Sequence, residues 1–208
     1  MTKVSNFKNW NTYERLRTVQ IRDIMAGASS YLLENMCAYA IQDPTEPINI
    51  IFTSDGGSVM EAIAATSAIG IARDLLDPSV PIIGTVHGNA SSSGSLLLQC
   101  CDIRRCMSDS FIMVHGISRS FFGGDDRTID ADSRNVEKLR NRFIDLYGAR
   151  SAEPRSYWEE LMRDNHPNYY TAEEAKEKGL IDEIIPSLII NHDNARSYLE
   201  RYKVGNSD

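Results

Sequence analysis

Chain length, composition and charge limit the classes of protein that this sequence can encode. It has 208 residues, of which 42% are hydrophobic and 25% are charged, amounts typical of a soluble globular domain and unlike those of a disordered tail. The net charge of −7 excludes a nucleic-acid-binding surface, because phosphate recognition needs concentrated Lys and Arg. The apolar runs fall short of the roughly 20 residues that span a bilayer, and residues 1–10 lack the apolar core of a secretory signal. We therefore expect no nucleic-acid partner and no membrane partner.

The four cysteines match neither a disulfide scaffold nor a common metal motif. They are Cys37, Cys100, Cys101 and Cys106. A chain of this length does not depend on a disulfide framework. The spacing of the last three matches no common zinc site, and no histidine lies close to them in sequence. We expect reduced thiols in the core of a cytosolic protein, and no metal site.

Strands and helices alternate through the first half of the chain. An apolar run over 46–54 is entered through Pro and closed by Asp-Gly-Gly, which is typical of a buried strand. Ser58, with Glu61 three residues later, predicts a capping box that starts a helix. The expected order is a strand near 17–25, a helix over 31–42, a strand over 46–54, a helix over 59–76, a strand ending at 86 and a helix over 92–101.

The second half continues this pattern after one interruption. Strands are expected at 102–107 and 111–115, before a glycine-bearing loop over 116–126. Apolar residues at helical spacing from Val136 to Tyr147 predict an amphipathic helix that Gly148 ends. Then come a helix over 156–164, a capping box of Thr171 and Glu174 opening a helix that Gly179 ends, and a strand over 180–185. The alternation favours an α/β fold with a mostly parallel sheet and helices outside it.

Three consecutive serines, Ser91 to Ser93, stand where the third expected strand passes into a helix. Serines in a row are most often a solvated turn. At a helix start, however, unpaired backbone N–H groups lie beside them, and a hydroxyl held there can attack a carbonyl while an N–H receives the oxyanion. The turn at Gly56 and Gly57 offers a second set of N–H groups. This arrangement suits acyl transfer, although the residues alone do not choose among the three serines.

A serine nucleophile needs a base, and the chain has four histidines. His115 ends an apolar strand, at the sheet edge where the sites of open α/β proteins gather. A histidine at a strand end is more often structural when it is judged alone. Asp164 ends a helix, a position that the helix dipole disfavours for an acid, so it is a candidate for the orienting carboxylate. The G-x-S-x-G elbow of the α/β-hydrolases is absent.

Four segments in order resemble the proteolytic subunit of the Clp protease, a self-compartmentalising serine peptidase. They are "DPTEPINIIFTSDGGSV", "GNASSSGSLLL", "FIMVHG" and "YYTAEEAKEKGLIDEII", and the likeness runs from Arg15 to Ile185. The resemblance implies a superhelix of ββα units, shared with the crotonase-like proteins, with a mostly parallel sheet and a protruding handle helix from Asn135 to Tyr147. We expect one domain over 1–208, with a core over about 15–185, an N-terminal segment over 1–14 and a C-terminal tail over 186–208.

The resemblance implies a serine endopeptidase that needs neither a metal nor a cofactor. It assigns the nucleophile to Ser92, the general base to His115 and the orienting carboxylate to Asp164. The backbone positions of its oxyanion hole correspond to Gly56, Gly57 and Ser93. Asp55 stands where the family usually has proline. A carboxylate there would repel a developing anion, so the site requires the Asp55 side chain to point away.

Partners also follow from the resemblance. Family members assemble as stacked seven-membered rings, so we expect a homo-oligomer. Unfolded polypeptides would be delivered by a separate AAA+ unfoldase of the Clp type, and the chain has no phosphate-binding loop of its own. Two alternatives remain open: a non-catalytic ring subunit with the same fold, and a crotonase-like acyl-CoA enzyme that stabilises an enolate with two backbone N–H groups and needs no Ser-His pair.

Overall fold

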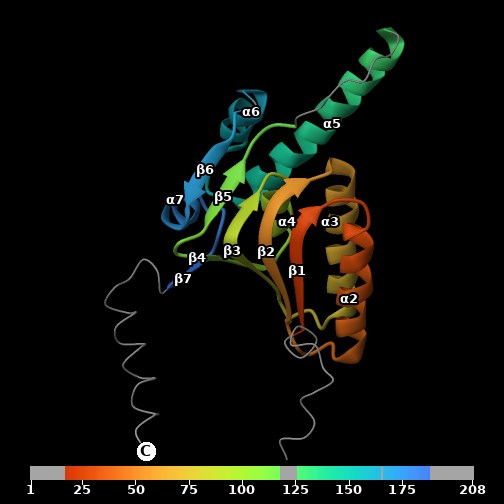
Figure 1. The fold of residues 1–208 in the computed structure, drawn as a ribbon, viewed down its shortest axis with the longest axis vertical. Helices are drawn as coiled ribbons and strands as arrows, with labels where there is room; N and C mark the ends of the chain where they lie inside the picture. The colour runs from red at the N-terminus through yellow and green to blue at the C-terminus, as the bar shows by residue number, and fades with distance from the viewer. Residues whose placement is uncertain (1–16, 118–125, 165, 188–208) are drawn as a thin grey trace, which may run out of the picture.

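The computed structural model describes residues 17–117, 126–164 and 166–187 (Figure 1). In chain order, the strands and helices of these ranges are β1 (Thr18–Ile24), α2 (Ala28–Gln42), β2 (Ile48–Gly57), α3 (Val59–Leu75), β3 (Ile82–Ser91), α4 (Ser93–Leu98), β4 (Ile103–Met107), β5 (Phe111–Val114), α5 (Asp126–Arg150), α6 (Arg155–Asp164), β6 (Asn168–Thr171), α7 (Ala172–Glu177) and β7 (Glu183–Ile185).

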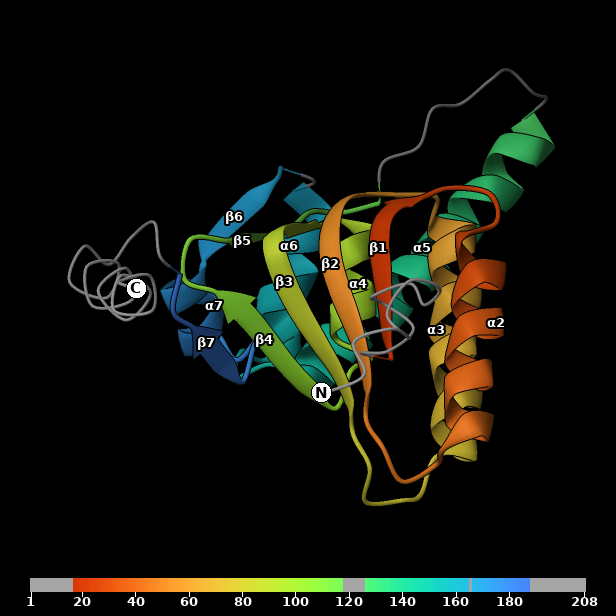
Figure 2. The same cartoon turned by 60° about the horizontal axis from the view of Figure 1, so that its bottom comes forward.

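A mostly parallel sheet forms the centre of the fold. Its strand order is β1-β2-β3-β4-β7, and every neighbouring pair in this series is parallel. β3 pairs with β4 through residues 83–86 and with β5 through residues 89–91, so its final third lies beside a different strand. Helices α2 and α3 lie side by side next to the sheet, and α4 packs on β2 and β3 (Figures 1 and 2). The expected α/β fold is confirmed.

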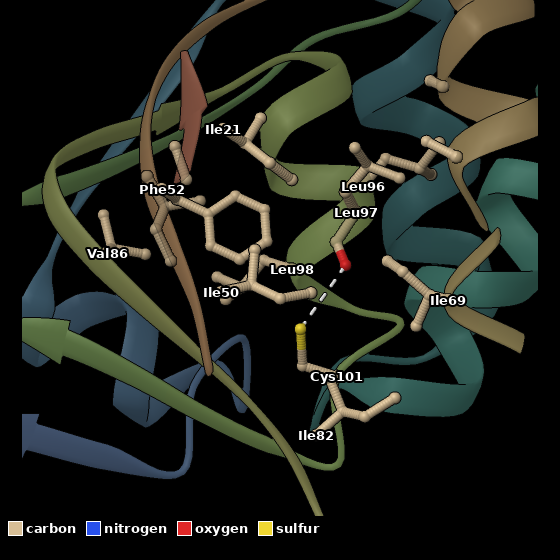
Figure 3. Close-up of a cluster of buried hydrophobic side chains, with 14 of the residues drawn as sticks. Ile21, Ile50, Phe52, Ile69, Ile82, Val86, Leu96, Leu97, Leu98 and Cys101 are labelled. Carbon is tan, nitrogen blue, oxygen red and sulfur yellow. Dashed lines mark hydrogen bonds between the residues drawn. The ribbon is translucent and has the colours of Figure 1, made fainter. Parts of the chain in front are cut away.

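Apolar strand residues and short-helix leucines fill the core between the sheet and the helices (Figure 3). Phe52 from β2 and Leu97 and Leu98 from α4 are fully buried, and each such side chain contributes about 1.5–3 kcal/mol through burial. Gly84 in β3 allows close packing, because a methyl group there would lie 2.6 Å from Cys101 Sγ. This packing fixes α4 against the strand end from which it begins.

Three differences from the expected elements have physical causes. β6 lies in a stretch predicted as a loop; it is antiparallel to β5, a partner that local sequence does not reveal. Gly148 does not end α5, which continues to Arg150. The capping box at Ser58 is only half formed: Ser58 accepts from the Glu61 N–H, but the Glu61 carboxylate accepts from Ser29 N (3.1 Å) and Ser29 Oγ (2.8 Å) instead. The Thr171–Glu174 box is complete, as predicted.

Helix α5 projects from the body of the molecule (Figure 1). Its side chains from 133 to 142 are exposed or half-buried, and full burial begins only at Ile144 and Tyr147. The inner end therefore packs on the core while the outer part stands clear of it, as expected for a handle helix. Within the described ranges, no helix combines the length and apolar composition needed to cross a membrane.

Candidate active site

Ser92 occupies the junction between β3 and α4 in a strained backbone conformation. Its φ is 54° and its ψ is −121°. Among the described residues other than glycine, Arg17 is the one other with a positive φ. Such a conformation costs about 1–3 kcal/mol and persists where the surrounding structure enforces it. Here the Ser92 N–H donates to Met113 O (2.8 Å), and its carbonyl accepts from the Leu96 N–H (3.2 Å).

The side chains of the three serines differ in their partners. Ser91 Oγ accepts from Asn89 Nδ2 (3.3 Å), and Ser93 Oγ donates to Gly57 O (3.1 Å). No hydrogen bond within the described ranges engages Ser92 Oγ. Ser91 and Ser93 are buried, whereas Ser92 is half-buried and lines a cavity to which Ser93 also contributes. The structure thus separates the middle hydroxyl from its neighbours, which the sequence alone did not do.

The cavity beside Ser92 has a volume of about 130 Å³, enough for a single side chain of a bound peptide. Polar and apolar groups from six segments meet around it. Its lining comprises Gly57, Val59, Ser92, Ser93, Leu96, His115, Gly116, Ile117, Phe143, Tyr147 and Met162. Ser92, His115, Gly57 and Ser93, all predicted from sequence, therefore share one cavity.

Strand register explains why Ser92 and His115 meet. β3 and β5 are parallel, with Ser91 opposite Met113. Each strand ends within two residues of that pair, so the residues that follow emerge at the same sheet edge. His115 Nδ1 contacts the carbonyl oxygen of Gly116. Because a carbonyl can only accept, this contact is a hydrogen bond in the tautomer that carries its proton on Nδ1, and in the neutral imidazole of that tautomer Nε2 is the proton acceptor. No hydrogen bond between described residues joins His115 to Ser92.

The glycine turn at the end of β2 packs directly against the serine turn. Gly56 and Gly57 have φ of +99° and +146°, values that side chains rarely adopt. A methyl group on Gly57 would lie 2.2 Å from Ile24 O. The Gly56 N–H already donates to Ser54 Oγ (3.1 Å), whereas Gly57 lines the cavity. Of the two glycine amides predicted for the oxyanion hole, Gly57 is thus the one at the cavity.

Asp55 points away from this cavity, as the site requires. It is exposed, and its Oδ1 accepts from Asn89 Nδ2 at 2.7 Å. The same amide nitrogen lies 3.1 Å from Ser54 O. Asn89 therefore holds the Asp55 carboxylate and joins the ends of β2 and β3, where their register shifts.

Asp164 lies apart from the other predicted residues. It is exposed, and its carboxylate is 3.9 Å from His166 Nε2. It lines a separate hollow with Tyr157, Glu160, Leu161, Arg163 and Asn168. Helix α6 ends at Asp164, and the chain then returns as β6, where Asn168 lies opposite Val114. The structure does not bring Asp164 to His115.

The four cysteines are free thiols. Cys101 and Cys106 are buried, while Cys37 and Cys100 are half-buried. Burial raises the pKa of Cys100 to about 11 and that of Cys106 to about 12, so both stay protonated near neutral pH. In the part of the chain that the structure describes, no three His, Cys, Asp or Glu residues gather as metal ligands would.

Several residues of the site were not identified from sequence. Phe143, Tyr147 and Met162 line the cavity from α5 and α6, but the helical spacing of Phe143 and Tyr147 indicated only an amphipathic helix. Ser54 and Asn89 support the glycine and serine turns. The one available signal was the polar character of Ser54 and Asn89 at the ends of otherwise apolar strands.

Comparison with known families agrees with this geometry. Residues 5–187 match the family model described as Clp protease. The chain belongs to the Clp protease family. It is 27% identical over 185 residues to an ATP-dependent Clp protease proteolytic subunit of Deinococcus radiodurans, covering 86% of each chain. It is 29% identical over 161 residues to the ATP-dependent Clp protease proteolytic subunit 1 of Chlamydia pneumoniae, covering 76% of this chain and 80% of that one.

Proposed function

We propose that this chain is a serine endopeptidase that cleaves unfolded polypeptides as the proteolytic subunit of a Clp protease. The observation that carries the proposal is the position of Ser92, which stands on a strained turn and shares a cavity with His115, Gly57 and Ser93. The parts that acyl transfer needs are a hydroxyl and an imidazole Nε2 that no other described residue engages, together with backbone amides, in one small cavity.

In the proposed reaction, Ser92 Oγ attacks the peptide carbonyl while His115 Nε2 takes its proton. The amides of Gly57 and Ser93 stabilise the oxyanion of the tetrahedral intermediate. His115 then gives the proton to the leaving amine as the C–N bond breaks, which leaves an acyl-enzyme. Water, deprotonated by the same imidazole, attacks the ester carbonyl. The bond between that carbon and Ser92 Oγ then breaks, His115 returns the proton to Ser92 Oγ, and the second product leaves as a carboxylic acid.

The orienting group of His115 is a separate part of the proposal. In the described conformation, Gly116 O contacts Nδ1 and fixes the tautomer that the base needs. Asp164, exposed and close to His166, has no such contact here. The role of orienting carboxylate is assigned to Asp164 by the family resemblance alone, and it would require the Asp164 side chain to leave His166 and approach His115.

Assembly into stacked heptameric rings, with a Clp-type AAA+ unfoldase supplying the substrate, completes the proposed function. The curated relatives are named ATP-dependent Clp protease proteolytic subunits, which supports coupling to an ATP-driven partner. Helix α5, which stands clear of the body, suits a role in joining rings. Sedimentation of the purified chain tests the assembly. A mass of fourteen subunits is expected, and a stable monomer at micromolar concentration would contradict it.

The alternative of a non-catalytic ring subunit gains support because Asp164 and His115 line different cavities. A fluorogenic peptide separates the two functions. Under ring-forming conditions the wild-type protein should hydrolyse it, and the Ser92→Ala variant should not. An assembled wild-type ring that leaves the peptide intact, alone and with a Clp-type unfoldase, would favour the non-catalytic role.

A further inference from the structure

We infer that Tyr147 on α5, acting through Ser95 on α4, is a positioning residue for the backbone amide of Ser93. This inference rests on the proposed serine-peptidase function, because it assigns a role in forming the oxyanion hole. Two hydrogen bonds connect Tyr147, Ser95 and Ser92. Tyr147 OH lies 2.7 Å from Ser95 Oγ, and Ser95 Oγ lies 2.7 Å from Ser92 O.

The direction of the two hydrogen bonds follows from the number of protons. Ser92 O can only accept, so Ser95 donates its single hydroxyl proton to it. Tyr147 must then donate to Ser95 Oγ. Ser95 is 0% exposed and Tyr147 is 1% exposed. Water therefore does not replace either donor, and loss of either hydroxyl leaves a buried group without its partner.

The Tyr147 ring is held in place by its neighbours. It stacks on Trp158 with ring centroids 4.9 Å apart, and Trp158 Nε1 donates to Ser151 Oγ (2.8 Å). Burial raises the pKa of Tyr147, so the phenol keeps its proton and remains a donor at neutral pH. A fixed ring with a protonated hydroxyl gives Ser95 a donor in a constant position.

The effect on the site passes through one peptide unit. Ser92 C=O and Ser93 N–H belong to the same planar peptide unit, in which they point in opposite directions. A fixed direction of the carbonyl therefore also fixes the direction of the N–H. Two donors hold that carbonyl, Leu96 N at 3.2 Å and Ser95 Oγ at 2.7 Å. Ser93 N–H is the proposed oxyanion donor, and the Tyr147–Ser95 pair therefore fixes the direction in which this donor points. A donor that is aimed in advance stabilises the transition state more than the bound substrate.

Three variants test this role: Tyr147→Phe, Ser95→Ala and the double variant. Each single substitution should lower kcat for a fluorogenic peptide on the order of tenfold and leave KM within about twofold. Tyr147 acts only through Ser95 in this scheme, so adding Tyr147→Phe to Ser95→Ala should cause no further loss of kcat. Tyr157→Phe is the matched control, since it removes a hydroxyl from the Tyr157–Tyr170 pair (3.0 Å) outside the cavity.

Hydrogen exchange of the peptide spanning residues 89–98 provides a readout that does not depend on turnover. It should be faster in Tyr147→Phe than in Tyr157→Phe. Wild-type kcat in Tyr147→Phe, additive losses in the double variant, or unchanged exchange would each overturn the positioning role while leaving the proposed function intact. A wild-type protein that does not hydrolyse the peptide would overturn the proposed function, and the positioning role with it.

Discussion

Gly56 packs so closely against Ser92 that a methyl group on Gly56 would lie 2.7 Å from Ser92 Cβ. The glycine turn of β2 and the nucleophile turn of β3 are therefore a single packed unit. Substitution at Gly56 must move one turn away from the other, and the positive φ of Gly56 adds backbone strain. This relationship makes the glycine turn a direct test of the site geometry.

The Gly56→Ala variant should lose most of its peptidase activity and about 1–3 kcal/mol of unfolding free energy. Urea unfolding and peptide hydrolysis measure the two effects. Gly70→Ala is the matched control: a methyl group there meets nothing within 4 Å, and it should stabilise α3 by up to about 1 kcal/mol. Wild-type turnover in Gly56→Ala would show that the two turns do not act together.

The Asp164→Asn variant should reduce kcat by less than about threefold, because the contact of His115 Nδ1 in this conformation is with Gly116 O. His115→Ala should reduce kcat by several orders of magnitude. Steady-state kinetics of both variants with the same peptide compare the two losses of kcat. If Asp164→Asn loses as much activity as His115→Ala, the active enzyme brings Asp164 to the imidazole, as the family resemblance implies.

Asn89 and Asp55 form an amide–carboxylate hydrogen bond whose two side chains can be swapped by mutation. Asn89→Asp places two carboxylates where Asn89 Nδ2 and Asp55 Oδ1 are now 2.7 Å apart, and their repulsion should separate the ends of β2 and β3. We expect a loss of turnover and a lower melting temperature. Adding Asp55→Asn restores an amide–carboxylate pair and should recover part of both. A double variant no better than Asn89→Asp would assign the effect to the contacts of Asn89 Nδ2 with Ser54 O and Ser91 Oγ.

Acid stability depends on Glu61. Two hydrogen bonds from Ser29 lower the pKa of this carboxyl from its ordinary value of 4.5. The bond from the Ser29 N–H has the larger effect and the bond from its hydroxyl the smaller. A lowered folded-state pKa contributes stability that is present above pH 4.5 and lost as the pH falls through the folded-state pKa. Urea midpoints at pH 7 and at about pH 3 should therefore differ more for the wild type than for Glu61→Gln. Equal differences would mean that the Ser29 contacts do not persist in solution.

Much of the fold could be predicted because the buried parallel strands are short apolar runs bounded by Pro and Gly. β6 could not, since its four residues gain strand structure only by pairing with β5. The end of α5 was also missed, because the helix continues past Gly148 to Arg150. Gly148 packs against the start of α6: a methyl group added to it would lie 3.4 Å from Arg155 Cα. In both cases tertiary contacts outweighed the local signal.

The candidate site was partly predictable for a related reason. Ser92 and His115 follow the ends of adjacent parallel strands, so their meeting depends on topology that the alternating elements indicate. The strained φ of Ser92 and the contacts of Asn89 and Ser95 depend on packing that no short motif encodes. The position of Asp164 depends on where α6 ends and how the chain turns into β6, and local sequence did not determine it.

The central claim is that the middle serine hydroxyl is activated by the imidazole at position 115. Reaction with a fluorophosphonate, followed by mass spectrometry of the labelled peptide, tests it most directly. We expect one label per chain on Ser92, no label in Ser92→Ala, and labelling slowed by orders of magnitude in His115→Ala. A label on Ser91 or Ser93, or an unchanged rate without His115, would contradict the account.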